Sequence, residues 1–551
     1  MRVVVAIVCG MAASASVAVG LGTLGGLDPL KAAIALAVGL AVAGLAVQRV
    51  LREPVATPGL WDVVLLAAWG VASFRAFFWL LYPQGDEWRI LSPHNLGDLS
   101  LHIGLIRYLA SGIDFWPPSQ ILAGELLTYP VGPDLFNSLL LLVGVDLRTG
   151  LIVVGFTLSL CGGYALWRFA GPLGVAAVLV GGGMAGFAIF RGVPFQEFGA
   201  DSTWKNAFLT MVVPQRGFLY SLPAGVALLW AWHSEFFGGR RLIPLALQVL
   251  LYATLPLFQL HSFLALSLVL ASAWLMRPSR APLVLAGLAF LPATVFVLLV
   301  TAKFSAGGRL RFEPLWALGE GNALSFLVEF GAAFVVAGAS LLAAFRSARK
   351  DAQWLTASGL ALALIGFLFP LTDWAWDNTK LLIWAWILPM PAIRDLVIRP
   401  QPLPARAAIC AVLFFTGSLA LLAGLDTRHG YTLARRSELA DWQRLLSPLP
   451  PDAVIACSPD YNHPALLLGR RVVCGYEGHL ASHGLDYRQT MGDLRRVLAL
   501  EPGWQGLARK LGANAVAIGN ASRPVLLSVP NKAAIGARDI PKTPSSSGNG
   551  Q

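Results

Sequence analysis

The sequence predicts an all-α polytopic membrane domain of about 13 transmembrane helices, followed by a small C-terminal α/β domain. The first reason is composition: 56% of the 551 residues are hydrophobic, 13% are charged, and the mean hydropathy is +0.65. Soluble domains are about 45–50% apolar. The second reason is that apolar segments of about 20 residues recur along the chain, each long enough to cross a bilayer as a helix. The third is that polar residues replace apolar ones after Leu425.

The apolar segments also predict how the chain is divided. They suggest an N-terminal transmembrane hairpin (1–57), a transmembrane domain (58–425) with a large loop at 83–147, an α/β domain (426–535) and a disordered, Ser/Gly/Pro-rich tail (536–551). The expected spans are 3–25, 29–50, 58–82, 148–168, 172–191, 216–235, 242–258, 261–276, 281–302, 323–345, 354–371, 380–398 and 407–425.

Basic residues in the short loops predict the orientation. Lys and Arg near span ends favour the cytoplasmic side. With the N-terminus in the cytoplasm, every alternate loop agrees, and those loops carry Arg49, Arg52, Arg168, Arg240, Arg241, Arg277, Arg280, Arg346, Arg349, Lys350, Arg399 and Arg406. The loop at 83–147 and the tail then lie outside the cytoplasm. This distribution explains the net charge of +11 without a nucleic acid partner.

The C-terminal part alternates two kinds of short segment. Between 433 and 531, helical runs such as SELADWQRLLSPL alternate with β-like runs such as DAVIAC and NAVAIGN, which is typical of α/β domains. Cys457 and Cys474 lie in this part, and a disulfide between them stays open because sequence alone does not show the geometry. Cys9, Cys161 and Cys410 lie in apolar spans and are most simply buried side chains.

The loop after the third span concentrates polar groups at a membrane edge. It carries Asp86, Glu87, His94, Asp98, His102, Tyr129 and Asp134. Residues 96–111 suit a helix along the membrane surface, with Asp98 and His102 four apart on one face. There is no Walker-type or Rossmann glycine motif, so nothing suggests a nucleotide as energy source or cofactor.

Carboxylates at the outer membrane surface suit glycosyl transfer from a lipid-linked sugar phosphate. One carboxylate takes a proton from the acceptor while cations hold the departing phosphate. Asp98 is the preferred base, with Asp86 and Glu87 as further catalytic candidates, and His102 and Tyr129 as substrate-binding candidates. The alternatives are that Asp98 caps its helix, that Asp86 and Glu87 cap the preceding span, and that His102 bonds to backbone.

Cationic residues on the same face supply candidate phosphate ligands. Arg216, at the start of a span, is preferred because a guanidinium can donate two parallel bonds; the alternative is that it snorkels to the interface. The other candidates are Lys205, Lys303, Arg309, Arg311 and Lys380.

Two further groups are candidate substrate-binding residues. His261 interrupts an apolar run, and an ionisable residue at that depth is a functional candidate. Trp376, Asp377 and Lys380 combine an indole, an acid and a cation, although tryptophan also belongs to ordinary interfacial belts.

With these residues in place, the chain resembles the GT-C superfamily of polytopic membrane glycosyltransferases, which includes protein mannosyltransferases and aminoarabinose transferases. The resemblance lies in the acid-bearing first large loop (GDEW, then GDLSLH), the many spans and the C-terminal α/β domain. The chain looks most similar to uncharacterised bacterial members with a loop like HNLGDLSLHIGLIRYLASG and a tail like YNHPALLLGRRVVCGYEGHLASHGLDY.

The resemblance implies a polyprenyl-phosphate-linked sugar donor, an extracytoplasmic acceptor, inverting transfer and a bacterial inner membrane location. It also implies a catalytic acid in the first loop, carried over to Asp98 with Asp86 and Glu87 behind it. Two extra spans precede the loop, so the module would begin near Leu60. No cofactor is certain, and the loop does not decide whether Mg²⁺ or Mn²⁺ is used.

The tail motif carries His463, His479 and His483 among closely spaced glycines. The spacing HLASH lacks the Glu of HExxH, so acceptor contact or docking onto the membrane domain is preferred over zinc binding, and a glycine-rich structural loop is the alternative. Two other functions for the whole chain stay open: a transporter or flippase of a lipid-linked saccharide, and a non-catalytic envelope-assembly protein on the same scaffold.

Overall fold

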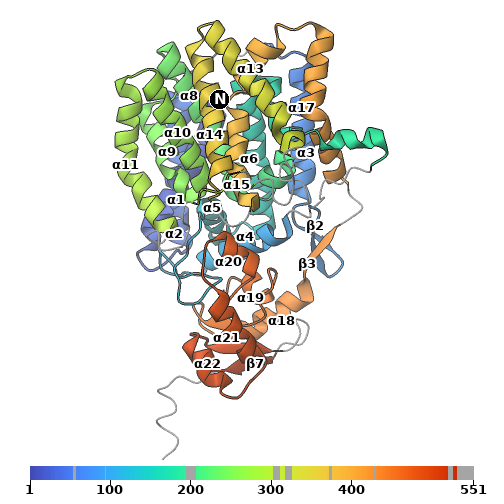
Figure 1. Ribbon diagram of the computed structural model, residues 1–551. Coiled ribbons are helices and arrows are strands. Elements are labelled where there is room, and N and C mark those ends of the chain that lie inside the picture. The colour runs from blue at the N-terminus through green and yellow to red at the C-terminus, as the bar shows by residue number, and fades with distance from the viewer. Residues whose placement is uncertain are drawn as a thin grey trace, which may run out of the picture.

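A computed structural model describes most of the chain. The described residues are 1–53, 57–92, 95–193, 206–301, 311–314, 316, 326–371, 375–426, 430–518 and 525–529. A bundle of helices forms one end of the molecule, and the C-terminal residues form a smaller body at the other end (Figure 1). Within the described ranges, nine helices are long and apolar enough to cross a membrane.

Most of the bundle helices correspond to expected spans. The bundle contains α1 (Arg2–Gly22), α2 (Pro29–Arg49), α3 (Leu60–Phe78), α6 (Leu147–Ala170), α7 (Pro172–Leu179), α8 (Arg216–Trp232), α9 (Leu245–Phe258), α10 (Leu260–Met276), α11 (Arg280–Val300), α13 (Ala332–Arg346), α14 (Lys350–Leu368), α15 (Ala375–Ile387), α16 (Met390–Ala392) and α17 (Leu403–Gly424). Short π-helical turns at Phe208–Val212, His233–Phe237, Leu327–Gly331 and Ile393–Ile398 precede or extend several of them. α9 and α10 are apolar but shorter than the nine, so the predicted count of about 13 is not confirmed.

The expected span at 172–191 is wrong. α7 ends at Leu179, and only a 3₁₀-helical segment follows at Ala185–Arg191. Three glycines, 181–183, lie between them. A Cβ at Gly182 would meet the backbone of Gly417 in α17, and a Cβ at Gly183 would meet the backbone of Glu329. The glycines therefore end the helix and let other backbones approach closely, which hydropathy alone does not reveal.

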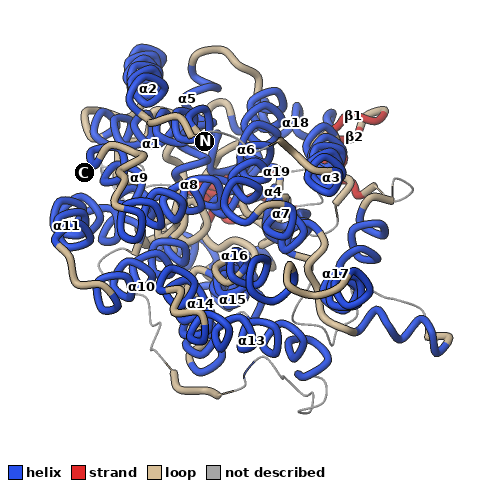
Figure 2. The backbone as a smooth tube through the Cα atoms, turned by 90° about the horizontal axis from the view of Figure 1, so that it is seen from above, coloured by secondary structure: helices blue, strands red, loops and turns tan. Residues whose placement is uncertain are grey.

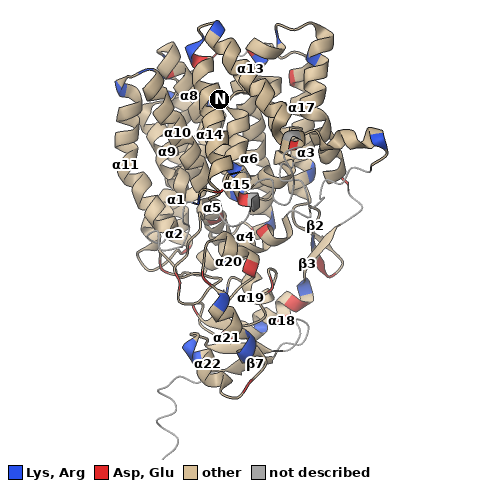
Figure 3. Ribbon diagram, in the orientation of Figure 1, with Lys and Arg blue, Asp and Glu red and all other residues tan. Residues whose placement is uncertain are grey.

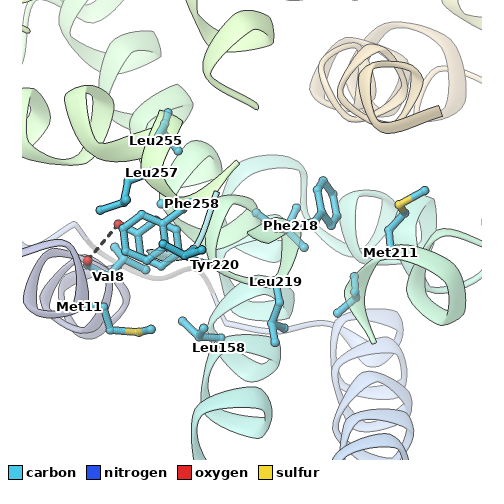
Figure 4. Close-up of a cluster of buried hydrophobic side chains, with 14 of the residues drawn as sticks. Val8, Met11, Leu158, Met211, Phe218, Leu219, Tyr220, Leu255, Leu257 and Phe258 are labelled. Carbon is cyan, nitrogen blue, oxygen red and sulfur yellow. Dashed lines mark hydrogen bonds between the residues drawn. The ribbon is translucent and has the colours of Figure 1, made fainter. Parts of the chain in front are cut away.

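Helix α8 lies toward the middle of the bundle, with α1, α6 and α9 around it (Figure 2). All of its residues except Gly217 are buried. In the cluster of Figure 4, the Tyr220 ring stacks on Phe258 at 3.6 Å between centroids, and its hydroxyl donates to the Val8 carbonyl at 3.1 Å. These contacts fix the start of α8 against the end of α9.

Two loop helices and a hairpin connect the bundle to the C-terminal body. The helices are α4 (Leu96–Leu109) and α5 (Gly132–Leu142), and the hairpin strands are β1 (Tyr82–Gln84) and β2 (Glu87–Ile90). Nearly all of α4 is buried, so other parts of the protein surround it on most sides. It packs against α5 on one side and against the C-terminal helix α19 (Pro464–Leu467) on another.

The C-terminal residues contain both strands and helices. Strand β3 (Tyr431–Arg435) pairs antiparallel with β2 of the loop hairpin, giving a sheet of order β1-β2-β3. A second sheet has the order β5-β4-β6-β7. Its strands are β4 (Val454–Ala456), β5 (Arg471–Val472), β6 (Ala515–Ile518) and β7 (Val525–Ser528), and the accompanying helices are α18 (Arg436–Leu446), α19, α20 (Glu477–Ser482), α21 (Arg488–Leu498) and α22 (Trp504–Lys510). Cys457 and Cys474 are both buried free thiols. The expected disordered tail at 536–551 lies outside the described residues.

Charged residues are concentrated in three regions of the molecule. Lys, Arg, Asp and Glu lie at the bundle end far from the C-terminal body, near the junction with that body, and on the body itself, while the helices between are almost free of them (Figure 3). This distribution fits helices that cross an apolar layer, because a charge there lacks water as a partner.

The close approach of α17 to the end of α7 predicts a packing defect. In Gly417→Ala, the added Cβ overlaps the Val180 carbonyl, so we expect destabilisation by about 1–3 kcal/mol and a lower thermal-unfolding midpoint of the purified protein. Gly287→Ala in α11 is the control, because nothing lies within 4 Å of its Cβ position. Equal midpoints for the two variants would contradict this account.

Candidate active site

Asp98 lies in the first turn of α4 and faces the bundle. The N-cap position of α4, directly before Leu96, is occupied by Asn95, so Asp98 is not the helix cap. Its Oδ2 accepts a hydrogen bond from Gln215 Nε2 at 2.9 Å. Burial raises the pKa of the Asp98 carboxyl, while His102 and Lys380 oppose that rise. A carboxylate withdrawn from water in this way is a better proton acceptor than an exposed one.

His102 is one turn further along the same helix and is held by a second carboxylate. Its Nδ1 lies 2.8 Å and 3.0 Å from the two oxygens of Asp134, and both side chains are buried. His102 therefore bonds to a carboxylate and not to backbone. Asp134 comes from the first turn of α5. The sequence shows this acid in the loop but gives no sign that it pairs with His102.

Arg216 is the first residue of α8 and is only 1% exposed. None of its three guanidinium nitrogens has a hydrogen-bond partner among the described residues. Asp134 is the charge that acts on it. The side chain therefore does not snorkel to an interface. Burial of an unpaired charge is costly, so this arginine is a candidate ligand for an anion.

The turn between α9 and α10 lies beside this arginine. A Cβ at Gly217, the residue after Arg216, would contact the Phe258 carbonyl. α9 and α10 rise about 21 and 26 Å, less than the roughly 30 Å of a hydrocarbon core. Their far ends adjoin exposed Arg241 and Arg277, which favour water. Two helices shorter than a full span thus meet at this turn, which packs against the start of α8.

Asp377 and Lys380 form an ion pair near the start of α15. Lys380 Nζ lies 2.6 Å from Asp377 Oδ1. The other carboxylate oxygen of Asp377 accepts from the Ser482 hydroxyl of the C-terminal body at 2.7 Å. His261, the second residue of α10, is close enough to interact electrostatically with both members of the pair. The side chain of Trp376 lies outside the described residues.

Helix α20 of the C-terminal body covers this cluster. The His483 ring stacks on Tyr129 with centroids 4.6 Å apart, and His479 bonds to the backbone of Gly97, the residue before Asp98. Burial lowers the pKa of His479 to about 4 and that of His483 to about 3, so both rings are neutral at pH 7. The HLASH segment thus docks on the helix that carries Asp98.

Three expected site residues contact other parts of the molecule. Asp86 is fully exposed, and its carboxylate accepts from the backbone N–H (3.1 Å) and the hydroxyl of Ser437 at the start of α18. Glu87 accepts from Thr432 Oγ1 at 2.9 Å within the β2–β3 pair. His463 accepts from the Ala465 N–H at 3.1 Å and so caps α19. The bonds of Asp86 and Glu87 tie the loop hairpin to the C-terminal body, and that of His463 lies within the body. None of them joins these residues to Asp98.

Comparison with solved structures shows which known fold the chain resembles. The match to the oligosaccharyltransferase AglB of Archaeoglobus fulgidus, in complex with an inhibitory peptide and a dolichol-phosphate, has a TM-score of 0.50 at 12% identity and covers 83% of this chain and 69% of that one. The chain has an oligosaccharyltransferase fold. A second structure of the A. fulgidus enzyme, tethered to an acceptor peptide, matches at a TM-score of 0.47 and 12% identity over 83% and 69% of the two chains.

AglB is a GT-C membrane glycosyltransferase, so at the level of fold the comparison confirms the resemblance seen in the sequence. No family model and no curated protein matches the chain. The oligosaccharyltransferase fold therefore rests on the path of the backbone, and the side chains must be considered by themselves.

Within the described part of this fold, no three His, Cys, Asp or Glu side chains gather to hold a metal ion. Asp98, Asp134 and Asp377 each have a different protein partner, namely Gln215, His102 and Lys380. This donor set does not fit a divalent ion, and we derive no step through one. Three cationic candidates, Lys205, Lys303 and Arg309, lie outside the described residues.

The neutral histidines of α20 predict acid-sensitive docking. Their pKa values are lower in the folded protein than the ordinary 6.5, so stability is complete above about pH 6.5 and falls as the pH drops toward 4, where the unfolded chain binds more protons. In His483→Phe, which keeps a ring against Tyr129, we expect a smaller loss of thermal stability between pH 7 and pH 5. An unchanged pH profile in His483→Phe would refute this role.

Proposed function

We propose that the chain is a membrane glycosyltransferase that moves a sugar from a polyprenyl-phosphate-linked donor to an extracytoplasmic acceptor. The observation that carries the proposal is that the residue bonded to Asp98 directly precedes a buried arginine without a partner. Gln215 bonds to Asp98, and the next residue is the buried, unpaired Arg216. Gln215, which holds the proposed base, and Arg216, the proposed anion ligand, are thus consecutive residues at the start of α8.

The start of α8 suits a lipid-linked phosphate. Arg216 lies at the positive end of the helix dipole, where backbone N–H groups favour anions. Its unpaired guanidinium offers a bidentate contact. In this proposal the donor's headgroup reaches the start of α8 while its isoprenoid chain stays in lipid. AglB, which has the same fold, was solved with a dolichol-phosphate.

Asp98 supplies the base in this scheme. The acceptor oxygen attacks the anomeric carbon, the bond from that carbon to the phosphate oxygen breaks, and the phosphate leaves with the electron pair. The acceptor proton passes to Asp98, and Arg216 holds the negative charge that grows on the phosphate. Attack opposite to the leaving group inverts the anomeric centre.

The surrounding residues would hold the reactants in place. Asp134 holds the His102 ring, and Lys380 lies within electrostatic range of Asp98 as a second cation for the donor. Ser482 and His483 bring the C-terminal body against the cluster, and in this scheme the acceptor arrives from that side. The loop side is taken as extracytoplasmic and the membrane as a bacterial inner membrane, on the grounds of the loop arginines and the family resemblance.

Replacing the base should abolish transfer. In Asp98→Asn, we expect a fall in rate of about 10²–10⁴-fold with normal insertion and yield. The assay follows release of polyprenyl phosphate from a panel of labelled polyprenyl-phosphate sugars, using purified protein in nanodiscs with an envelope extract as acceptor. Asp114→Asn, an exposed acid of the same loop, is the control.

Transfer by Asp98→Asn at the wild-type rate would remove Asp98 as the base. If neither protein transferred sugar but both bound donor tightly, the enzyme proposal would fail in favour of transport or assembly.

Replacing Arg216 should separate binding from stability. In Arg216→Met, we expect affinity for polyprenyl phosphate to fall about tenfold or more, while the thermal midpoint does not fall, because an unpaired buried charge is removed. Arg107→Met is the matched control. Arg107 donates to the Leu467 carbonyl at 2.8 Å, so its loss should lower the midpoint and leave lipid binding intact. A lower midpoint with unchanged lipid binding in Arg216→Met would make Arg216 structural.

A further inference from the structure

The second sheet of the C-terminal body has a topological switch point. β4 is parallel to β5 on one side and to β6 on the other. The chain moves from β4 outward to β5 and then returns to the opposite side of β4 to form β6. In open sheets of this kind, ligands bind in the crevice outside the carboxyl ends of the strands, at the point where the strand order reverses. Here that point lies between the ends of β4 and β6.

A cavity of about 530 Å³ occupies this position. Ser458 and Asp460, which follow β4, and Ala517 and Ile518 at the end of β6 line it. Strand β3 and helix α18 form the other wall. The volume is within the usual range for small-molecule sites. None of the residues of the Asp98 cluster lines it, so this is a separate cavity.

The lining combines unengaged acceptors with donors over an apolar floor. Glu438 is half-buried, makes no hydrogen bond to the described residues, and has Arg435 as its neighbouring cation. Asn462 donates through Nδ2 to the Leu433 carbonyl at 2.7 Å, which leaves its amide oxygen as an acceptor. Asp460 accepts from Ser458 at 2.6 Å and keeps further lone pairs. The floor is formed by Leu433, Trp442, Pro464 and Leu498.

The polar groups and the apolar floor of the cavity indicate which class of ligand it suits. Carboxylates beside the opening disfavour a phosphate, and the polar rim disfavours a purely apolar molecule. A sugar ring has vicinal hydroxyls for carboxylate and amide oxygens, and C–H faces for the apolar floor. We propose that the cavity binds a saccharide unit, as a second carbohydrate site apart from the Asp98 cluster.

The position of the cavity relates it to the loop. Its wall strand β3 pairs with β2 of the loop hairpin, and its helix α19 packs on α4, which carries Asp98. A saccharide held here would lie on the element that joins the C-terminal body to the bundle. It could belong to a soluble glycan or to the glycan of a lipid-linked saccharide, and both present the same hydroxyls.

The test is direct sugar binding to the full-length protein. Glucose, mannose, galactose and N-acetylglucosamine are presented to purified protein in nanodiscs, and binding is followed by saturation-transfer NMR. We expect a signal from at least one sugar, and about tenfold weaker binding in Glu438→Gln or Asp460→Asn, since each loses a charge-assisted hydrogen bond. Asp441→Asn on the same helix is the control, because Asp441 pairs with Arg444 and does not line the cavity.

Two further arms identify the source of the sugar. Displacement by a polyprenyl-phosphate sugar supports a lipid-linked glycan, and displacement only by free oligosaccharides supports a soluble one. The proposal is overturned if no sugar binds, if Asp441→Asn weakens binding as much as Glu438→Gln, or if inorganic phosphate or an extended peptide displaces the sugar. Binding is measured without turnover, so these outcomes do not depend on whether Asp98 catalyses transfer.

Discussion

Burial of helix α8 on nearly every side is the constraint on which the candidate site depends. An apolar helix packed against α1, α6 and α9 has one position available, so its first residues are held as firmly as its middle. The stack of Tyr220 on Phe258 links that position to the turn between α9 and α10. Gln215 consequently meets Asp98 of the loop at a fixed place, although the two residues lie far apart in the sequence. The rigid part of the molecule is the bundle core, and the polar groups stand at its edge.

The first large loop and the C-terminal body form one unit on that edge. β2 pairs with β3, and residues 120–123 exchange backbone hydrogen bonds with residues 472–475. Within this unit α4 lies between α5 and helix α19 of the C-terminal body, which explains why a helix of the loop is almost fully buried. Because Ser482 and His483 reach Asp377 and Tyr129 from the C-terminal side, the cluster is complete only when both parts are docked.

The cluster contains charged groups that are buried with few or no partners. Arg216 is buried without a partner, and Asp98 is withdrawn from water with one hydrogen bond from Gln215. Groups of this kind are costly in a folded protein and are retained where a ligand supplies the missing charge. In contrast, Arg107 donates to the Leu467 carbonyl. These unengaged groups are the ones that the proposed function assigns to the reactants.

The sequence alone determined the features that depend on local pattern. Long apolar runs predicted most of the bundle helices, and spacing placed Asp98 and His102 on one helical face. Only the tertiary structure decided the pairings between distant segments, such as Asp134 with His102, Gln215 with Asp98 and Ser482 with Asp377. It also showed that Asp86, Glu87 and His463 serve other bonds, and that the glycines after α7 end an expected span. Hydropathy and spacing report what each segment favours by itself. Partners across the chain follow from packing, which no single segment encodes.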